Sequence, residues 1–290
     1  MQETIGWIGV GSMGHRMSRH LGNAGYPLLV ADAVSTERAP EGASIAHTNA
    51  EVAARAATIF LSLPDGLVSQ TVARELAAAP DRKAKTVIDT STIGIAAAEA
   101  CTSLLAASGI EYIDAPVSGG TSGADKATIA IMVACARSSF ERVEPLLRLM
   151  GKPFYVGPKA GQAQAVKVLN NFLSATALAA TSEAIAFGTQ QGIDMKTILD
   201  IVNASSGRNS ATEDKFLNRI LHGRYDAGFR AKLQLKDIRL YLEAARATGI
   251  ADAIASAVVD LWQRMDADVP GADITEMYRY TRQQGQLKRQ

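Results

Sequence analysis

The stretch IGWIGVGSMG, residues 5–14, decides the fold. It is an apolar run that ends in three glycines with the spacing GxGxxG. Residues 14–24 have a helical composition, and a second apolar run follows at 26–31. A GxGxxG that ends a strand and opens a helix, inside a βαβ unit of about thirty residues, is typical of a dinucleotide-binding turn. The alternative is a glycine-rich surface turn.

Each glycine of this turn has its own physical reason. Gly9 allows a tight turn, Gly11 lets backbone N–H groups approach a pyrophosphate, and Gly14 lets the helix pack closely on the strand. The amino end of the helix adds partial positive charge for the anion. The residues expected to bind the cofactor here are Gly9, Val10, Gly11, Ser12, Met13 and Gly14.

Asp32 ends the second apolar run, eighteen residues after Gly14. A carboxylate at this place accepts hydrogen bonds from the ribose hydroxyls of the adenosine and repels a 2′-phosphate. Asp32 therefore favours NAD as the cofactor, whereas the nearby Arg38 keeps NADP open as the less favoured choice. If the turn were only a surface loop, Asp32 would be an ordinary surface aspartate.

The first half of the chain continues to alternate apolar runs with alanine-rich segments. The further strand candidates are 58–63, 86–89, 112–114, 129–134 and 154–156. The helix candidates between them are 49–56, 66–78, 95–108 and 138–149. This alternation predicts βαβ units and a mainly parallel sheet with helices on both faces. The strand runs are continuously apolar, as expected when both faces of a sheet are covered.

The second half contains no convincing strand. Its helix candidates are 162–191, 194–204, 211–222, 231–247, 251–265 and 273–283. We therefore expect an α/β domain of the Rossmann type at 1–160 and an all-α domain at 161–290, which begins with a long interdomain helix. The sequence GPKAG at 157–161 marks the boundary.

Composition excludes several other classes of protein. With 30 basic and 29 acidic residues the net charge is +1, which argues against a nucleic-acid partner. No apolar run approaches the length of a membrane span, and no targeting segment is apparent. The two cysteines and four scattered histidines lack metal-ligand spacing, so we expect no metal site and a reducing, cytoplasmic location.

Lys167 is the first candidate for acid/base chemistry, because no histidine is suitably placed. Its neighbours in GQAQAVKVLNN, residues 161–171, are small or apolar, which indicates a largely buried helix. Asn171 lies four residues later and shares its helical face. Burial would lower the pKa of a lysine toward neutrality, as a proton shuttle requires. The alternative is a lysine that snorkels to water from a helix end.

Two further polar features follow the same reasoning. The turn DAPVSGGTSG, residues 114–123, follows a strand, and its small residues Ser118, Gly119 and Gly120 can form a nest for a carboxylate. An ordinary surface loop is the alternative. The pair Lys236–Asp237 lies in a helix among leucines and isoleucine, where a solvated charge pair is the simpler interpretation.

The sequence resembles the β-hydroxyacid dehydrogenase family over nearly its whole length. That group includes 3-hydroxyisobutyrate dehydrogenases and tartronate semialdehyde reductases. The motifs that carry the resemblance are IGWIGVGSMGHRM at 5–17, LPD at 63–65, DTST at 89–92, DAPVSGGTSGA at 114–124, IAIMVA at 129–134, AVKVLNN at 165–171 and GFRAKLQLKDI at 228–238. Several motifs in family order are far more specific than GxGxxG alone.

The resemblance implies roles in substrate binding and catalysis. Lys167 matches the catalytic lysine of the family, which exchanges a proton with the substrate oxygen. Asn171 matches the asparagine that holds the substrate beside it. The carboxylate-binding turn of the family corresponds to Ser118, Gly119 and Gly120.

Further cofactor contacts are also implied by the resemblance. Leu63, Pro64 and Thr92 match positions whose loops line the nicotinamide and its ribose. Lys236 matches an interdomain lysine that approaches the nicotinamide end from the helical domain. The family also implies a homo-oligomer, a dimer or a tetramer.

The chain departs from the family pattern at several small residues. Ala127 and Ala163 stand where the family has glycine, and Ala134–Cys135 stands where Gly-Gly is frequent. The proline that is usual after the ST motif is absent from the segment Thr92-Ile93-Gly94-Ile95. These departures bear on local backbone geometry rather than on a proposed catalytic group.

Together these features predict an NAD-dependent oxidoreductase that interconverts a small 3-hydroxy acid and its semialdehyde or 3-oxo acid. The expected partner is a small substrate that carries a carboxylate, and Arg208 and Asn209 are candidate specificity residues. The alternatives are an imine reductase of the same fold, or a non-catalytic dinucleotide-binding protein.

Overall fold

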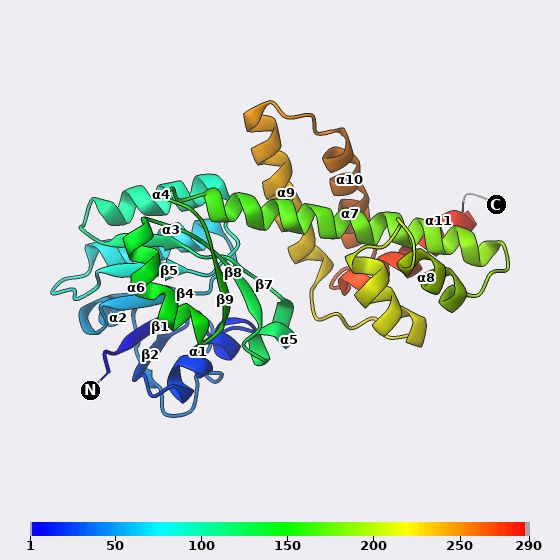
Figure 1. The fold of residues 1–290 in the computed structure, drawn as a ribbon. Coiled ribbons are helices and arrows are strands. Elements are labelled where there is room, and N and C mark those ends of the chain that lie inside the picture. Colours follow the sequence, from blue (N-terminus) through cyan, green and yellow to red (C-terminus); the bar gives the residue numbers. More distant parts are fainter. Residues whose placement is uncertain (1, 288–290) are drawn as a thin grey trace. The chain divides into compact units, whose positions relative to one another are not determined.

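The structure is a computed structural model that describes residues 2–287 (Figure 1). It comprises two compact units, Met1–Lys167 and Val168–Gln290. The first unit is a sheet covered by helices and the second is helical, which is the fold class expected from the sequence. Helix α7, Gln162–Gln190, begins in the first unit and continues into the second.

The first unit alternates strands and helices along the chain. Its strands are β1 Ile5–Ile8, β2 Leu28–Ala31, β3 Ser44–Ile45, β4 Thr58–Leu61, β5 Thr86–Asp89, β6 Glu111–Asp114, β7 Val117–Ser118, β8 Ile129–Ala134 and β9 Gly151–Gly157. Its helices before α7 are α1 Gly14–Asn23, α2 Asn49–Arg55, α3 Gly66–Ala78, α4 Ile95–Ala106, α5 Gly120–Asp125 and α6 Arg137–Arg148.

The strand order indicates at which edge of the sheet a ligand would bind. It runs β3-β2-β1-β4-β5-β6-β8-β7, with β9 paired to β8. Neighbours from β3 through β6 are all parallel, whereas β8 runs antiparallel to β6 and β7. The order reverses direction between β1 and β4, and open sheets of this kind bind ligands at the carboxyl ends of the strands at such a point.

Alternation along each strand separates two hydrophobic cores, one on each face of the sheet. Trp7 and Phe60 point to one face, where they stack at 5.0 Å between ring centroids and pack with residues of α1, α5 and α6. Ile59 and Leu61 point to the other face, toward α2, α3 and α4. Both faces are therefore buried, which explains why the strand sequences are apolar throughout.

The second unit packs helices around one core. After α7 come α8 Met195–Asn203, α9 Ala231–Thr248, α10 Ala253–Asp268 and α11 Met277–Leu287, with three shorter helices among them: η1 Ala211–Phe216, η2 Ile220–His222 and η3 Ile274–Glu276. Helices α9 and α10 lie side by side (Figure 1). Trp262 and Phe216 are fully buried in this core, and Phe172 of α7 stacks on Tyr241 of α9.

The structure corrects two expected elements. The sequence predicts one helix at 211–222, but the segment forms a π-helix, η1, followed by the 3₁₀ turn η2. The side chain of Asn209 accepts hydrogen bonds from the backbone N–H groups of Ala211 and Thr212, and this binds the start of η1 to the preceding loop. Gly223 then ends η2 in a left-handed conformation.

The second correction concerns 114–123, for which the sequence predicts a turn. The segment contains strand β7, which pairs antiparallel with β8, and the first residues of α5. Two strand residues are too few to give a periodic signal in the sequence. None of the helices within residues 2–287 has the length and apolar character needed to cross a membrane.

Candidate active site

The glycines of the turn between β1 and α1 meet two different steric requirements. Gly9 has a φ of +93°, and a Cβ there would lie 2.2 Å from the carbonyl oxygen of Ser62. A Cβ on Gly14 would lie 1.9 Å from the carbonyl oxygen of Gly9. Backbone atoms cannot yield as a flexible side chain can, so both positions require glycine.

Gly11 differs, because the space beside it is open. Among the described residues, no heavy atom lies within 4 Å of a Cβ placed on Gly11. No described side chain caps α1, and no acidic residue stands in its first turn. An exposed glycine beside an uncapped helix amino end is an arrangement that accepts a pyrophosphate. The turn therefore fits the phosphates of a dinucleotide.

Asp32 holds this turn in place. Its Oδ2 accepts a hydrogen bond of 2.8 Å from the backbone N–H of Val10, and its Oδ1 accepts from the N–H groups of Val34 and Ser35. The sequence interpretation missed this bracing role. Carboxylate oxygens can accept further bonds, so the expected contact with an adenosine ribose stays a prediction.

The loops after β4 and β5 are joined to each other. The backbone N–H of Leu63 donates to Ser91 Oγ at 2.7 Å, and Thr90 Oγ1 donates to the carbonyl oxygen of Leu61 at 2.6 Å. The loop positions implied by the family resemblance, Leu63, Pro64 and Thr92, therefore follow neighbouring strands at the same edge as Gly9 and Asp32. Their contacts with a nicotinamide stay predictions.

The proposed carboxylate nest lies between β7 and α5. Ser118 ends β7 and is half-buried, while Gly119 and Gly120 are exposed and have φ values of +133° and +63°. A Cβ on Gly119 would also approach the Cα of Ile129 to 3.3 Å. Successive backbone N–H groups in a turn can converge on one anion, as in anion-binding nests. The geometry is compatible with the expected role.

Lys167 lies on α7 and is buried, with 8% of its surface exposed. Asn171, one turn later on the same helix, is 7% exposed. A snorkelling lysine would keep its ammonium group in water, so this burial disfavours that alternative. The structure thus buries Lys167 on one face of α7, as expected from the sequence, although Leu169 and other residues of this helix are exposed; the catalytic role of Lys167 stays a prediction.

Asp237 is the polar residue that sequence reasoning undervalued. It is 3% exposed, so it does not belong to a solvated charge pair. Its Oδ2 accepts a hydrogen bond of 2.5 Å from Asn171 Nδ2, and its Oδ1 lies 2.9 Å from Lys236 Nζ. Gln234 Nε2 donates to the backbone oxygen of Asn171. Asp237 therefore fixes the orientation of the Asn171 amide and brings Lys236 to the same cluster.

The two candidate specificity residues lie in different settings. Asn209 donates to Thr181 Oγ1 and to the carbonyl oxygen of Gly207, and its Oδ1 accepts bonds from the start of η1. Its amide is thus engaged in local structure. The Arg208 side chain is 63% exposed, with Glu213 at 3.7 Å. A role in specificity stays a prediction for both residues.

Two buried carboxylates stand at the ends of two neighbouring strands, directly before the loops that follow these strands. Asp89 of β5 and Asp114 of β6 are partners in the ladder, and both are fully buried. Burial raises the pKa of Asp89 above its ordinary value and raises that of Asp114 to about 6. Asp89 accepts hydrogen bonds from the Ser91 N–H and from the Tyr112 hydroxyl, and these bonds counteract part of the rise in pKa that burial causes.

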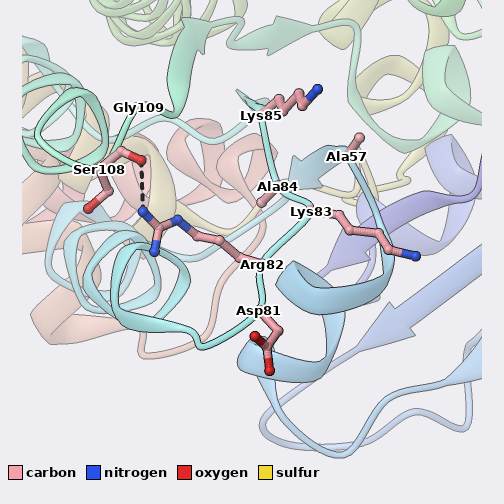
Figure 2. A pocket seen from close by; sticks show the side chains of 8 residues that line it. All are labelled: Ala57, Asp81, Arg82, Lys83, Ala84, Lys85, Ser108 and Gly109. Atoms are coloured by element: carbon pink, nitrogen blue, oxygen red, sulfur yellow. Dashed lines mark hydrogen bonds between the residues drawn. The ribbon is translucent and has the colours of Figure 1, made fainter.

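A surface hollow elsewhere on the first unit is not part of this arrangement. It is lined by Ala57, Ser108, Gly109 and residues 81–85, and Arg82 donates across it to the carbonyl oxygen of Ser108 at 2.9 Å (Figure 2). These residues precede β4, β5 and β6, so they lie at the amino ends of the strands, opposite the phosphate turn. Within residues 2–287 no group of His, Cys, Asp and Glu side chains could hold a metal ion.

Family models match both units. The model described as the NAD binding domain of 6-phosphogluconate dehydrogenase matches residues 4–182. The model described as the NAD-binding domain of NADP-dependent 3-hydroxyisobutyrate dehydrogenase matches residues 161–281. The first description names NAD and the second names both NAD and NADP, so the matches establish a nicotinamide dinucleotide without deciding between the two.

Individual proteins are similar over nearly the full chain. A 2-(hydroxymethyl)glutarate dehydrogenase of Eubacterium barkeri is 34% identical, covering 90% of this chain and 95% of its own. An NAD-dependent L-serine dehydrogenase of Pseudomonas aeruginosa is 33% identical, covering 89% of this chain and 91% of its own.

Solved structures agree in fold. A Mycobacterium tuberculosis 3-hydroxyisobutyrate dehydrogenase with L-serine is 29% identical, has a TM-score of 0.89, and covers 97% of this chain and 100% of its own. A Streptomyces aurantiacus imine reductase is 20% identical with a TM-score of 0.64 over 96% of this chain and 99% of its own. The likeness to the imine reductase is one of fold alone.

Proposed function

The chain belongs to the β-hydroxyacid dehydrogenase family, and we propose that it interconverts a small 3-hydroxy acid and its semialdehyde or 3-oxo acid. The observation that carries this proposal is the buried Lys167 one turn before the buried Asn171 on α7. An oxidoreductase that acts on a CH–OH group needs one proton acceptor at the substrate hydroxyl, and the chain offers this lysine in place of a histidine.

The proposed chemistry divides the work among a few residues. A bound nicotinamide dinucleotide supplies the acceptor or donor of hydride, and the turn from Gly9 to Gly14 would hold its phosphates. Lys167 takes the proton from the substrate hydroxyl in oxidation and returns it to the carbonyl oxygen in reduction. Ser118 and the two glycines after it bind the substrate carboxylate. The side-chain amide of Asn171, which is held by its hydrogen bond to Asp237, orients the substrate.

A substrate screen tests this proposal. The purified protein is incubated with NAD or NADP and a panel of serine-like, isobutyrate-like, tartronate-like, hydroxymethylglutarate-like and sulfonated 3-hydroxy acids, and reduced cofactor is followed by absorbance. We expect turnover with at least one carboxylate and less with its amide analogue, because the amide lacks the charge for the nest. Reduction of a cyclic imine without any turnover of hydroxy acids would instead indicate an imine reductase.

We propose NAD as the preferred cofactor. The support is Asp32, whose carboxylate follows β2 and would repel the 2′-phosphate of NADP. Asp32→Asn keeps an oxygen for the Val10 N–H but removes the negative charge, so it should reduce the preference for NADH over NADPH. Dissociation constants for NADH and NADPH measure this, and equal binding of the two by the wild-type protein would refute the proposal.

We also propose that the chain forms a homo-oligomer through α7. Leu173 and Phe187 on this helix are 60% and 67% exposed, which is unusual for large apolar side chains on a long helix. Light scattering coupled to size exclusion gives the mass in solution. Replacing both residues with glutamate should lower that mass if α7 is the interface.

A cytoplasmic location is part of the same proposal. Cys101 and Cys135 are free and buried, and burial raises the pKa of their thiols to about 12 and about 11. Thiols of this kind persist in a reducing compartment. Fractionation of the native cells would test the location.

A further inference from the structure

Gln164 is a fully buried amide on the first turn of α7, three residues before Lys167. Its Oε1 accepts hydrogen bonds from the backbone N–H groups of Ile93 and Gly94, at 2.9 and 3.1 Å. Its Nε2 donates to the carbonyl oxygen of Ser91 at 3.0 Å and to Asp114 Oδ1 at 2.8 Å. All four hydrogen-bonding positions of the amide are used, so its orientation is fixed.

Asp114 completes the cluster from the end of β6. Its Oδ2 accepts from the backbone N–H groups of Gly161 and Gln164, at 3.0 and 3.2 Å. Every one of these partners is a donor, and two of them are backbone groups at the amino end of α7, where a negative charge is favoured. Asp114 therefore binds this helix end while Gln164 binds the loop after β5.

The cluster joins three parts of the first unit. The start of α7 is tied to the segment 91–94, which follows β5, and to the end of β6. Segment 91–94 contains Thr92, which the family resemblance assigns to the nicotinamide side of the site. Lys167 lies on the next turn of α7, so a shift or rotation of the first turn displaces its Nζ relative to that loop.

We propose that Gln164 and Asp114 form a positioning pair, which sets the Lys167 amine against the loop that follows β5. This inference rests on the proposed function, because it assigns the pair a task in proton transfer. Neither residue touches the reacting atoms, so both act through the placement of α7. A displacement of about 1 Å in such a group can cost a hundredfold in rate, whereas binding of the dinucleotide at the distant phosphate turn should change little.

The first test compares Gln164→Leu with Gln162→Leu. Gln162 lies two residues earlier, is exposed, and accepts one bond from the Lys159 N–H. Each protein is assayed for NADH dissociation constant, NADH-binding stoichiometry, KM and kcat per NADH-binding site. We expect kcat of Gln164→Leu to fall at least tenfold with KM and the NADH dissociation constant within about threefold of wild type, while Gln162→Leu retains wild-type values.

The second test exchanges the two side-chain types. In Asp114→Asn alone, two amide side chains face each other with too few acceptors for their N–H groups. In Gln164→Glu alone, two carboxylates face each other with no donor between them. In the double variant the new amide at position 114 donates to the new carboxylate at position 164, and the bonds to Ile93, Gly94 and Gly161 are kept. At the Ser91 carbonyl oxygen a donor is replaced by a carboxylate oxygen, so two acceptors face each other both in Gln164→Glu and in the double variant. Because Gln164→Glu shares this contact with the double variant, we expect the double variant to exceed Gln164→Glu in kcat per binding site by at least fivefold.

The outcomes separate the pair's role from the proposed function. If kcat per binding site of Gln164→Leu stays within twofold of wild type, or if the double variant shows no recovery, the positioning role is overturned while the function stands. If Gln164→Leu does not fold, the comparison of single and double exchange variants decides. If wild type and Gln162→Leu both bind NADH but turn over no hydroxy acid, the proposed function is overturned, and the role of the pair with it.

Discussion

Substituting alanine at Gly11 and at Gly14 should separate cofactor binding from folding. At Gly14 the new Cβ would lie 1.9 Å from the Gly9 carbonyl oxygen and 3.0 Å from Trp7 Nε1, so the backbone of the turn must shift. Overpacking of this kind costs about 1–3 kcal/mol of stability, or more. At Gly11 the Cβ meets nothing within 4 Å among the described residues, so the free energy of unfolding should change by less than about 1 kcal/mol.

Gly11→Ala should weaken cofactor binding strongly, although it leaves the stability of the protein nearly unchanged. The open space beside it is where a pyrophosphate approaches the backbone, and a Cβ there would remove about one hydrogen bond to a charged group. Such a bond contributes roughly 1.5–3 kcal/mol, which corresponds to about 10- to 150-fold weaker binding. Gly11→Ala should therefore be a stable protein with a poor affinity for NADH.

Urea unfolding and NADH fluorescence titration measure the two quantities on the same preparations. Gly22→Ala, in α1 but away from the turn, serves as a control for the addition of a methyl group to this helix; its new Cβ would meet only the Leu28 side chain, at 3.3 Å, and not backbone atoms. If Gly11→Ala bound NADH within twofold of wild type, the turn would not be the phosphate site. If Gly14→Ala were as stable as wild type, the steric reason for the third glycine would be wrong.

Two further predictions concern stability. Ala127 has a φ of +54°, a conformation that costs an L-residue about 1–2 kcal/mol, so Ala127→Gly should raise the free energy of unfolding by about 0.5–1 kcal/mol. The control Ala257→Gly, at an exposed position inside α10, should lower the free energy of unfolding by about 1 kcal/mol. Equal effects of the two substitutions in urea unfolding would contradict this prediction. Burial raises the pKa of Asp114 to about 6 from 3.8, so the folded protein binds a proton that the unfolded chain has released, and this stabilisation is full below about pH 4 and lost as the pH rises through 6. At about 1.4 kcal/mol for each pH unit, Asp114 should account for a decrease of roughly 3 kcal/mol in unfolding free energy between pH 4 and pH 7, which should be missing in Asp114→Asn; parallel profiles for the two proteins would argue against it.

Much of the first unit could be predicted from local sequence. The GxGxxG turn has a short-range steric cause, since Gly9 and Gly14 each face backbone atoms, and so it leaves a fixed spacing in the sequence. Continuous apolar runs likewise mark strands that are covered on both faces. The long α7 is visible because its 29 residues are rich in alanine and are interrupted only by Gly188.

Other features depend on contacts between distant segments and left no local signal. Strand β7 exists only because it pairs with β8, and η1 is wound as a π-helix beside a loop that Asn209 ties down. Gln164 is one of several polar residues in an alanine-rich helix, and its four partners come from two other segments. Asp237 gave a weak signal: it lies three residues after the buried Gln234 and beside the buried Ile238, on the inward face of α9.

The departures from the family pattern acquire a physical meaning in the structure. Ala127 stands in the left-handed region, which explains why glycine is usual there. Ala134 and Ala163 belong to one small buried cluster with Met132, so the two methyl groups added by these alanines occupy the same region. In the segment 92–95, which lacks the usual proline, the backbone N–H groups of Ile93 and Gly94 donate to Gln164.

The role of Lys167 is the central claim, and the most direct measurement is the turnover of Lys167→Ala on a 3-hydroxy acid that the wild-type protein oxidises. A positioned acid/base contributes about 100- to 10,000-fold, so kcat should fall by at least about a hundredfold while the NADH dissociation constant stays close to that of the wild-type protein. Turnover within about tenfold of wild type, with NADH binding intact, would contradict the assignment of Lys167 as the group that carries the proton.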